Sequence, residues 1–331
     1  MSKQLLDVQG LSVTFTTHQG TARVLEKVSL SLQAGEILGL VGETGCGKSV
    51  LARSILRLIP QPPGRIHEGR IMFQEKNLLK LSARAMRSVR GRCISMIFQE
   101  PLSSLNPVFT IGNQMREMAR LHLGLGREAA NEHCAAMLAR VRLPDARGLL
   151  RKYPHELSGG QRQRVMIAME LSCGPQLLLA DEPTTALDVT VQGQILQIIK
   201  EQAAQRDMAV LLITHDMGVV AQTCDRVAVM YAGVVVETAT VADLFARPEH
   251  PYTQGLIAAI PGRERIQQLL TIPGTVPDLV TPPPGCRYHP RCVLRVKNCN
   301  RIEPELSTIG AQHAVACHLS AGKPQENWRR P

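Results

Sequence analysis

The 331-residue sequence is poor in aromatic side chains, which make up 3% of the chain and include a single tryptophan. Proteins that bind single-stranded nucleic acid stack bases on aromatic rings, so this scarcity counts against that class. No apolar stretch approaches the roughly 20 residues that a membrane-spanning helix needs. The N-terminus has an acid and polar residues where a signal peptide would carry its apolar stretch, which predicts a cytoplasmic protein.

Positive charge, by contrast, is in excess. The chain has 38 Lys and Arg residues against 28 Asp and Glu residues, which gives a formal net charge of +10. This charge suits an anionic partner such as a nucleotide, a nucleic acid or the anionic face of a membrane. Hydrophobic residues make up 44% of the sequence, which is typical of a globular protein with a substantial core. The length predicts one large domain with smaller appendages.

Strand and helix patterns alternate along the chain, which predicts an α/β fold with a parallel sheet. Alternating apolar and polar residues at 5–15 and 28–32 predict an additional antiparallel β layer. The strand pattern disappears between about 102 and 157, where residues 111–123 and 127–141 have helical spacing, so we expect a helical insertion. The apolar runs typical of buried strands lie at 37–41, 94–98, 176–180, 210–214 and 227–231, and further helical spacing lies at 49–59 and 191–204.

Residues 42–49 fit the phosphate-binding pattern G-x-x-x-x-G-K-S and lie between an apolar strand and a predicted helix. In such a loop, glycines let backbone N–H groups curl around phosphate oxygens, Lys48 reaches the β- and γ-phosphates, and the Ser49 hydroxyl ligates Mg²⁺. A chance glycine turn is the alternative. The expected nucleotide-binding residues of this loop are Gly42, Glu43, Thr44, Gly45, Cys46, Gly47, Lys48 and Ser49.

Cys46 stands at a variable position of this loop, where other small residues would also serve. We expect it to be a small packing side chain. The alternative is a thiol whose pKa is lowered by the nearby helix N-terminus and which reacts when no nucleotide protects it.

Two carboxylates, Asp181 and Glu182, follow the predicted strand at 176–180, at the edge where a parallel sheet presents its ligand-binding ends. Asp181 can hold Mg²⁺, and Glu182 can polarise the attacking water. Acids at such a place also cap helices, and Pro183 would suit the first turn of one. Together with the phosphate loop, the two acids favour a nucleoside triphosphatase.

The segment Leu157-Ser158-Gly159-Gly160-Gln161 precedes a predicted helix, and a Ser-Gly-Gly turn at a helix N-terminus is a second phosphate-binding surface. With this segment, residues 1–260 resemble the ABC-transporter ATPases, whose LSGGQ signature closes over ATP bound by the partner subunit. The resemblance implies a P-loop NTPase (RecA-like) core with an antiparallel β layer and a helical insertion, and ATP and Mg²⁺ as ligands. It also implies a dimer whose sites are completed by the partner's Ser158, Gly159, Gly160 and Gln161.

The resemblance assigns roles to four more residues. Gln99 matches the Q-loop residue that senses Mg²⁺ and the attacking water, and His215 matches the switch histidine that contacts the γ-phosphate. Asp188 matches the D-loop at the dimer interface, and Phe15 stands where the family stacks an aromatic ring on adenine. Structural roles are the alternatives: a polar strand end for Gln99, a satisfied histidine for His215 and simple packing for Phe15. We therefore expect Glu182, His215 and Gln99 to be catalytic and Ser49, Gln99 and Asp181 to hold Mg²⁺.

Two further segments, 100–107 and 250–254, resemble the oligopeptide, dipeptide and nickel importer branch of the family, and the dipeptide-type ATPase most of all. The resemblance implies an ATPase subunit that powers di- and oligopeptide import from the cytoplasmic face of the inner membrane. Its implied partners are a second ABC ATPase, two permease subunits and an extracytoplasmic solute-binding protein, with no nucleic acid. Nickel or another small solute is the alternative cargo. The alternative class is a soluble ABC-type ATPase acting on nucleic acid or ribosomes, although the chain lacks the heptad run of a coiled coil.

Residues 261–331 are predicted to form a C-terminal extension after an ATPase domain at 1–260. Four cysteines in this extension can ligate an iron–sulfur cluster or a tetrahedral zinc ion. Their spacing matches neither the short zinc pattern nor the common ferredoxin pattern, so spacing alone does not name the metal. The family resemblance favours a [4Fe–4S] cluster over Zn²⁺, and unligated thiols are the remaining alternative. The cysteines are Cys286, Cys292, Cys299 and Cys317.

Overall fold

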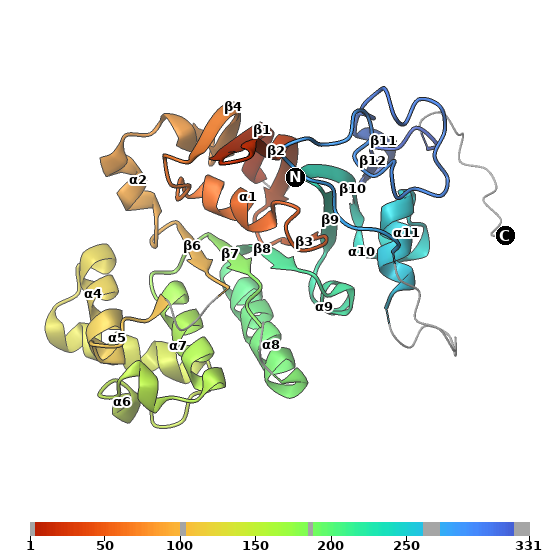
Figure 1. Cartoon of the computed structure of the whole chain (residues 1–331). Coiled ribbons are helices and arrows are strands. Elements are labelled where there is room, and N and C mark those ends of the chain that lie inside the picture. The colour runs from red at the N-terminus through yellow and green to blue at the C-terminus, as the bar shows by residue number, and fades with distance from the viewer. Residues whose placement is uncertain (1–3, 100–103, 185–187, 261–271, 321–331) are drawn as a thin grey trace. The chain divides into compact units, whose positions relative to one another are not determined.

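The computed structural model of the chain describes residues 4–99, 104–184, 188–260 and 272–320 (Figure 1). It divides into two compact units. Unit 1 comprises Met1–Leu6, Leu32–Ile37 and Phe73–Ile213, and unit 2 comprises Asp7–Ser31, Leu38–Met72 and Thr214–Pro331. Four of the eight residues in the importer-like segment 100–107, the first residues of the predicted helical insertion, and both ends of the C-terminal extension lie outside the described residues.

Unit 1 is built on three parallel strands, β6 (Ile94–Ile97), β7 (Leu177–Asp181) and β8 (Ala209–Thr214). All their residues are buried, which explains why the sequence shows continuous apolar runs here in place of alternation. In the register, Ile97 lies beside Ala180 and Asp181 lies beside Ile213. The carboxyl ends of β6 and β7 therefore lie side by side. Smaller elements of this unit are β5 (Lys76–Asn77), the 3₁₀ helix η1 (Leu78–Lys80) and α2 (Ala83–Val89).

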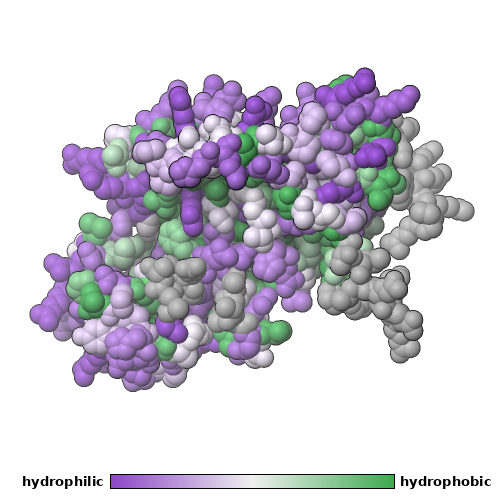
Figure 2. Space-filling view, viewed as in Figure 1, coloured by the Kyte–Doolittle hydropathy of each residue, from purple (hydrophilic) through white to green (hydrophobic). Residues whose placement is uncertain are grey.

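The predicted helical insertion is present between β6 and the helix α7 (Gly159–Leu171). It contains α4 (Ile111–Leu123), α5 (Arg127–Arg140), α6 (Ala146–Leu149) and the 3₁₀ helix η2 (Pro154–Glu156). The spacing of apolar residues placed α4 and α5 within one residue of their observed ends. Helix α5 packs against both α4 and α7. Figure 2 shows mainly hydrophilic side chains around α6 on the viewed face.

Unit 2 carries a mixed arrangement of strands, of which β3 (Ile37–Val41) and β9 (Arg226–Tyr231) are parallel. Strand β10 (Val234–Thr240) is antiparallel to β9, and β12 (His313–Val315) is antiparallel to β10. Strand β11 (Ser307–Gly310) pairs with β12. Strands β11 and β12 thus form a small hairpin that extends the sheet of β10 and β9. The sequence did not predict this hairpin, because its short strands have no clear periodicity.

A second sheet in unit 2 has the strand order β2-β1-β4, formed by β1 (Gln4–Thr17), β2 (Gly20–Gln33) and β4 (Gly64–Phe73). A connection of two residues joins β1 to β2, and a turn this short joins only antiparallel strands. This arrangement agrees with the predicted antiparallel β layer. The remaining helices of the unit are α1 (Lys48–Ile55), α9 (Met217–Thr223), α10 (Val241–Ala246) and α11 (Pro251–Ala258).

Helix α1 is shorter than the predicted helix at 49–59. Its last helical residue is Ile55, and Arg57 has a φ of 52°, a left-handed conformation that does not continue an α-helix. Pro60 follows shortly afterwards, so the apolar spacing beyond Ile55 belongs to a loop.

Three of the chain's four tyrosines lie in the hydrophobic core of unit 2. The Tyr231 ring meets the rings of Tyr252 and Tyr288 edge to face, with centroids 4.7 and 5.1 Å away. Cys286 and Cys292 pack against the same core. The C-terminal extension is therefore tied to this unit by a shared apolar interior.

No helix in the described parts of the chain combines the length and the apolar character needed to span a bilayer.

Candidate functional site

The phosphate-type loop connects β3 to α1 in unit 2, and its backbone demands glycine at two positions. Gly42 has a φ of 154°, and a Cβ there would lie 2.1 Å from the Met230 carbonyl oxygen. Gly47, with a φ of 104°, would place a Cβ 2.8 Å from the Val24 carbonyl oxygen. Only glycine fits such close backbone approaches at positive φ. Thr44 and Gly45, at the tip of the loop, are exposed to solvent.

Lys48 places a positive charge inside this loop. It is the first residue of α1, and its side chain is buried against the loop backbone. Its Nζ donates to the carbonyl oxygens of Gly42 at 2.7 Å and Glu43 at 3.0 Å. The Lys48 cation and the N-terminus of α1 both create positive potential at this loop. Ser49 is the next residue of the helix. This arrangement suits a polyanion such as a nucleotide phosphate.

Cys46 is fully buried, and burial raises the pKa of its thiol, although the charge of Lys48 acts in the opposite direction. The alternative of a reactive thiol with a lowered pKa is therefore wrong. Cys46 packs beneath the loop, with its sulfur 3.7 Å from Lys48 Nζ.

The two predicted acids lie at the carboxyl end of β7 in unit 1, beside Gln99. Asp181 is the last residue of the strand and is 1% exposed. Gln99 Nε2 donates to Glu182 Oε2 at 3.0 Å, and the Glu182 N–H donates to the Ile213 carbonyl at 3.0 Å. These side chains meet because β6, β7 and β8 are parallel and in register. A carboxylate held by an amide in this way is placed to orient a water molecule.

Glu182 has a φ of 47°, a left-handed conformation that is unusual for a residue with a long side chain. Such conformations carry strain and concentrate at functional sites. Neither Asp181 nor Glu182 caps a helix, because the next helix of the described chain, α8 (Val189–Arg206), has Asp188 as its N-cap. The capping alternative for the two acids is therefore wrong.

The signature segment forms the N-terminus of α7. The Ser158 side chain accepts a hydrogen bond from the Gln161 N–H at 3.3 Å, and the Gln161 side chain accepts one from the Ser158 N–H at 3.0 Å. This reciprocal cap fixes the first turn. Ser158 and Gly159 are exposed, whereas Gly160 faces α8, where a Cβ would lie 3.2 Å from Val191. An exposed, fixed helix N-terminus is well suited to bind an anion.

The remaining predicted residues lie on both units. Asp188, in unit 1, accepts the Val191 N–H at 2.9 Å as the cap of α8. His215, in unit 2, follows β8 and is exposed to solvent. Phe15 is half-buried on β1, with its ring edge facing Gly64. Residues 185–187, between Glu182 and Asp188, lie outside the described part of the chain.

The four cysteines of the extension share one electrostatic environment. Burial, and to a lesser extent the charges of Cys299, Cys317 and Cys292, together raise the pKa of Cys286 to about 11. Burial likewise raises the pKa values of Cys292 and Cys317. The thiol donors fit iron–sulfur or zinc chemistry. However, among the described residues no three Cys, His, Asp or Glu side chains are grouped closely enough to hold a metal ion. The geometry thus does not confirm the expected cluster.

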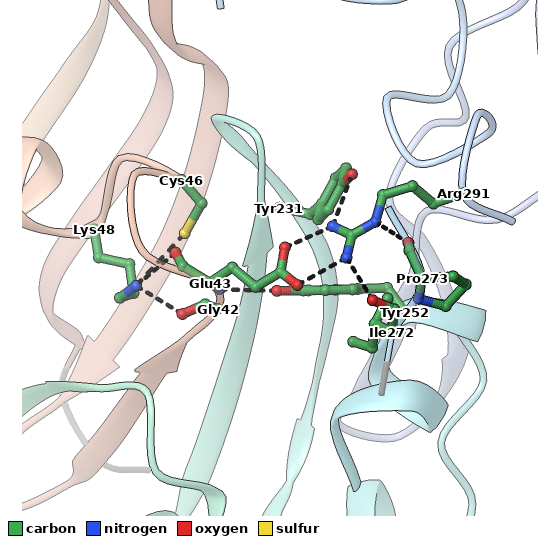
Figure 3. Close-up of polar contacts among 9 residues, drawn as sticks. All are labelled: Gly42, Glu43, Cys46, Lys48, Tyr231, Tyr252, Ile272, Pro273 and Arg291. Carbon is green, nitrogen blue, oxygen red and sulfur yellow. Dashed lines mark hydrogen bonds and ion pairs between the residues drawn. The ribbon is translucent and has the colours of Figure 1, made fainter. Parts of the chain in front are cut away.

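Sequence reasoning missed two residues that contact the phosphate loop (Figure 3). The Arg291 guanidinium donates to both carboxylate oxygens of Glu43, at 2.6 and 3.0 Å. The Tyr252 hydroxyl accepts the Glu43 N–H at 2.8 Å. The sequence did contain one indication of such a contact. Glu43 places a negative charge in a loop that binds anions, and a partly buried charge of this kind is usually paired with a cation.

Comparison with known proteins agrees with this geometry. Residues 25–185 match the family model described as ABC transporter, and residues 236–299 match the one described as oligopeptide/dipeptide transporter, C-terminal region. The dipeptide transport ATP-binding protein DppD of Bacillus subtilis is 48% identical over 96% of this chain and 95% of its own. The oligopeptide transport ATP-binding protein OppD of the same organism is 45% identical over 96% of this chain and 89% of its own.

Among solved structures, the dimeric bacterial ABC transporter cassette MJ0796 superposes with a TM-score of 0.65 and 25% identity. The match covers 71% of this chain and 98% of that one. It confirms the predicted α/β fold of the ATPase core. The phosphate loop, the paired acids, the signature segment and the near-complete match to these relatives lead to one assignment: the chain belongs to the family of ABC transporter ATP-binding proteins.

Proposed function

We propose that this chain is the nucleotide-binding subunit whose ATP hydrolysis powers import of di- and oligopeptides through a pair of membrane permeases. The observation that carries the proposal is the match of nearly the whole chain to DppD, a dipeptide transport ATP-binding protein. The match to the oligopeptide/dipeptide transporter C-terminal region supports the same cargo.

In this proposal the phosphate loop of unit 2 holds the triphosphate. Its backbone N–H groups and Lys48 bind phosphate oxygens, and Ser49 offers a hydroxyl to the metal that accompanies ATP. Lys48 is already directed into the loop, since it donates to the carbonyl oxygens of Gly42 and Glu43. Phe15, on β1 of the same unit, stacks on the adenine, and His215 contacts the γ-phosphate.

On unit 1, Glu182 serves as the general base that polarises the attacking water, and Gln99 orients it. The hydrogen bond between their side chains supports this pairing, because each fixes the other. The oxygen donors of Ser49, Gln99 and Asp181 suit a hard cation, and bound Mg²⁺ would neutralise charge on the phosphates during transfer.

We assign the signature residues Ser158, Gly159, Gly160 and Gln161, with Asp188, to the ATP held by a partner ATPase. The exposed, capped N-terminus of α7 supports this role, because its N–H groups are fixed for an anion from outside the unit. A second ABC ATPase is the proposed partner, so that two such sites close around two ATP molecules. Binding of ATP favours the closed pair, and hydrolysis releases it.

The proposed organisation is an ATPase domain at residues 1–260, with a helical subdomain at about 102–157, and an extension at 261–331. The helices α4, α5 and α6 support the subdomain, which is the proposed contact for permease loops. The C-terminal family match at 236–299 overlaps the boundary of the extension. The proposed location is peripheral, at the cytoplasmic face of the inner membrane, with an extracytoplasmic solute-binding protein as the cargo receptor.

For the extension we propose a [4Fe–4S] cluster on Cys286, Cys292, Cys299 and Cys317, with Zn²⁺ as the competing metal. The Cys286 N–H donates to the Cys299 carbonyl oxygen at 2.8 Å, and this contact between two of the four cysteines supports a shared site. Each step of ATP hydrolysis above is independent of this metal.

The test is purification of the tagged chain from gently solubilised native membranes, followed by mass spectrometry of its partners and peptide uptake in cells lacking the gene. We expect two permeases, a second ATPase and a peptide-binding protein, and uptake restored by the wild-type chain but not by a Lys48→Ala variant. Recovery with a nickel-type binding protein would redirect the cargo. Recovery with ribosomes or nucleic acid, without permeases, would overturn the transport function.

A further inference from the structure

The geometry points to a positioning role for Tyr252 and Arg291 in ATP binding: together they form a brace that holds Glu43 and fixes the phosphate loop. We use the term brace for Glu43, Tyr252 and Arg291. Through it, the C-terminal extension contributes to the ATP site of its own chain, a role that the motifs of the ATPase core do not contain. The inference rests on nucleotide binding by the family and not on the peptide cargo.

Glu43 is held at three separate groups (Figure 3). Its carboxylate accepts from both terminal nitrogens of Arg291, at 2.6 and 3.0 Å, and its N–H donates to the Tyr252 hydroxyl at 2.8 Å. Its carbonyl accepts from Lys48 Nζ at 3.0 Å. A residue in the middle of a glycine-rich loop is thereby fixed in both its backbone and its side chain.

Arg291 is itself immobilised before it reaches Glu43. Its side chain is only 6% exposed, and its Nε donates to the Pro273 carbonyl at 2.8 Å. Its guanidinium also lies over the Tyr231 ring, 5.7 Å from the centroid. A cation held by a backbone carbonyl and an aromatic face loses little entropy on pairing, so its two-pronged contact orients the carboxylate strongly.

Tyr252 is held at the start of α11 by a buried polar network. The Tyr252 N–H donates to His250 Nδ1 at 3.1 Å, and the His250 N–H donates to Glu237 Oε2 at 2.9 Å. Glu237 is fully buried and also lies 2.7 Å from His313 Nε2 on β12. The importer-like segment at 250–254 therefore has a structural explanation: it presents the Tyr252 hydroxyl to the phosphate loop.

Charge explains why the brace matters for ATP. Glu43 places an anionic carboxylate in a loop whose ligand is a polyphosphate, and like charges at such distances repel. Arg291 neutralises this carboxylate and directs it away from Lys48, toward the extension. Without Arg291, the carboxylate is free to repel the phosphates or to compete with them for Lys48. The brace thus predicts that removing Arg291 weakens ATP binding, and that also removing the charge of Glu43 restores part of it.

The experiment compares the full-length wild-type chain with Arg291→Met, Glu43→Gln and the double variant. Calorimetry gives the Kd for AMP-PNP with Mg²⁺, and steady-state assays give KM and kcat for ATP. We expect Arg291→Met to raise Kd and KM about tenfold with kcat within about twofold, since the lost interaction acts on binding. The double variant should bind at least about threefold more tightly than Arg291→Met alone, because the pair is coupled.

Arg147→Met is the matched control. Arg147 also contacts both oxygens of a carboxylate, that of Glu132, at 3.0 and 2.9 Å, but this pair lies on the helical insertion and is exposed. We expect its Kd to equal that of the wild type. If Arg291 only stabilised the fold, Arg291→Met would lower the melting temperature, and adding Glu43→Gln would not restore AMP-PNP binding.

A Kd for Arg291→Met within twofold of wild type would overturn the brace, as would a double variant no tighter than the single one. If Arg291→Met does not fold, Arg291→Lys replaces it: loss of one hydrogen bond should still weaken binding about two- to fivefold, and an unchanged Kd overturns the proposal. These measurements need no peptide. Failed peptide uptake by a wild-type chain that binds AMP-PNP would therefore reject the cargo and leave the brace standing.

Discussion

Gln99 and Glu182 are 83 residues apart in the chain, yet Gln99 Nε2 donates to Glu182 Oε2 at 3.0 Å. Each residue follows a parallel strand, and the pairing of Ile97 with Ala180 aligns the two strand ends. A water molecule bound between a fixed carboxylate and an amide has both an acceptor for its proton and a donor to orient it. This relationship makes Glu182 the first residue to test.

Glu182→Gln should reduce ATP turnover about a hundredfold or more, because an amide does not accept the proton of the attacking water. Binding of ATP should persist, and the variant should accumulate as a closed ATP-bound dimer. Single-turnover hydrolysis and gel filtration with ATP measure the two effects.

The matched control is Glu201→Gln, since Glu201 lies on the surface of α8 and pairs with Arg142 at 2.7 Å. Its turnover should equal that of the wild type. Near-normal turnover in Glu182→Gln would exclude Glu182 as the base.

Gly42→Ala tests the backbone of the phosphate loop. The added Cβ would lie 2.1 Å from the Met230 carbonyl oxygen and 2.9 Å from Cys46 Sγ, so the loop or β9 must shift. We expect ATP binding to weaken at least about tenfold, because misplaced N–H groups no longer converge on the phosphates.

Gly193→Ala is the control for this change. Gly193 lies within α8, and a Cβ there meets no atom within 4 Å. The change should leave ATP binding unaltered and stabilise the helix by up to about 1 kcal/mol. Equal ATP affinity in Gly42→Ala and the wild type would contradict the close packing of the loop on β9.

The predicted features that the structure bears out depend on short stretches of sequence. Helices α4 and α5 were located by the spacing of their apolar residues, and the buried strands by continuous apolar runs. The phosphate loop was recognised because its glycines, Lys48 and Ser49 must lie at fixed intervals. In each case the residues that form the pattern lie close together in the chain, so the pattern can be recognised in a single sequence.

The brace could not be predicted in this way. Arg291 is 248 residues from Glu43, and Tyr252 is 209 residues from it. No periodicity connects such partners, and Arg291 is one of 38 basic residues in the chain. The hairpin of β11 and β12 was not predicted for a related reason. Its strands form by pairing with each other and with β10, and their own sequence shows no strand pattern.

The proposed cluster predicts that the anaerobically purified chain contains iron. Single changes of Cys286, Cys292, Cys299 or Cys317 to Ser should each remove most of it, because an oxygen donor is a poor replacement for a thiolate ligand. A ferrozine assay with elemental analysis measures the metal. Cys93→Ser, in unit 1, is the control, and a chain with this change should retain the iron of the extension. If the wild-type chain contains zinc and no iron, the four cysteines bind the competing metal. If it contains neither metal, the cluster is excluded and the four cysteines are free thiols.

The buried His250 predicts how stability depends on pH. His250 is 1% exposed, and burial lowers its pKa from about 6.5 to about 4, although Glu237 acts in the opposite direction. Its neutral Nδ1 accepts the Tyr252 N–H, so protonation at this atom would remove the bond that starts α11. In the unfolded chain, the histidine binds a proton at a higher pH than in the folded chain. The stabilisation is therefore fully present above pH 6.5 and is lost as the pH falls toward 4.

His250→Asn should flatten this dependence, because an asparagine oxygen can accept the Tyr252 N–H and does not titrate. Between pH 7 and pH 4.5 the wild type should lose up to about 3 kcal/mol of unfolding free energy more than the variant does. Urea unfolding at several pH values measures the difference, and His155→Asn, at an exposed histidine of η2, is the control. Parallel pH profiles for the wild type and His250→Asn would show that His250 titrates alike in the folded and unfolded chains.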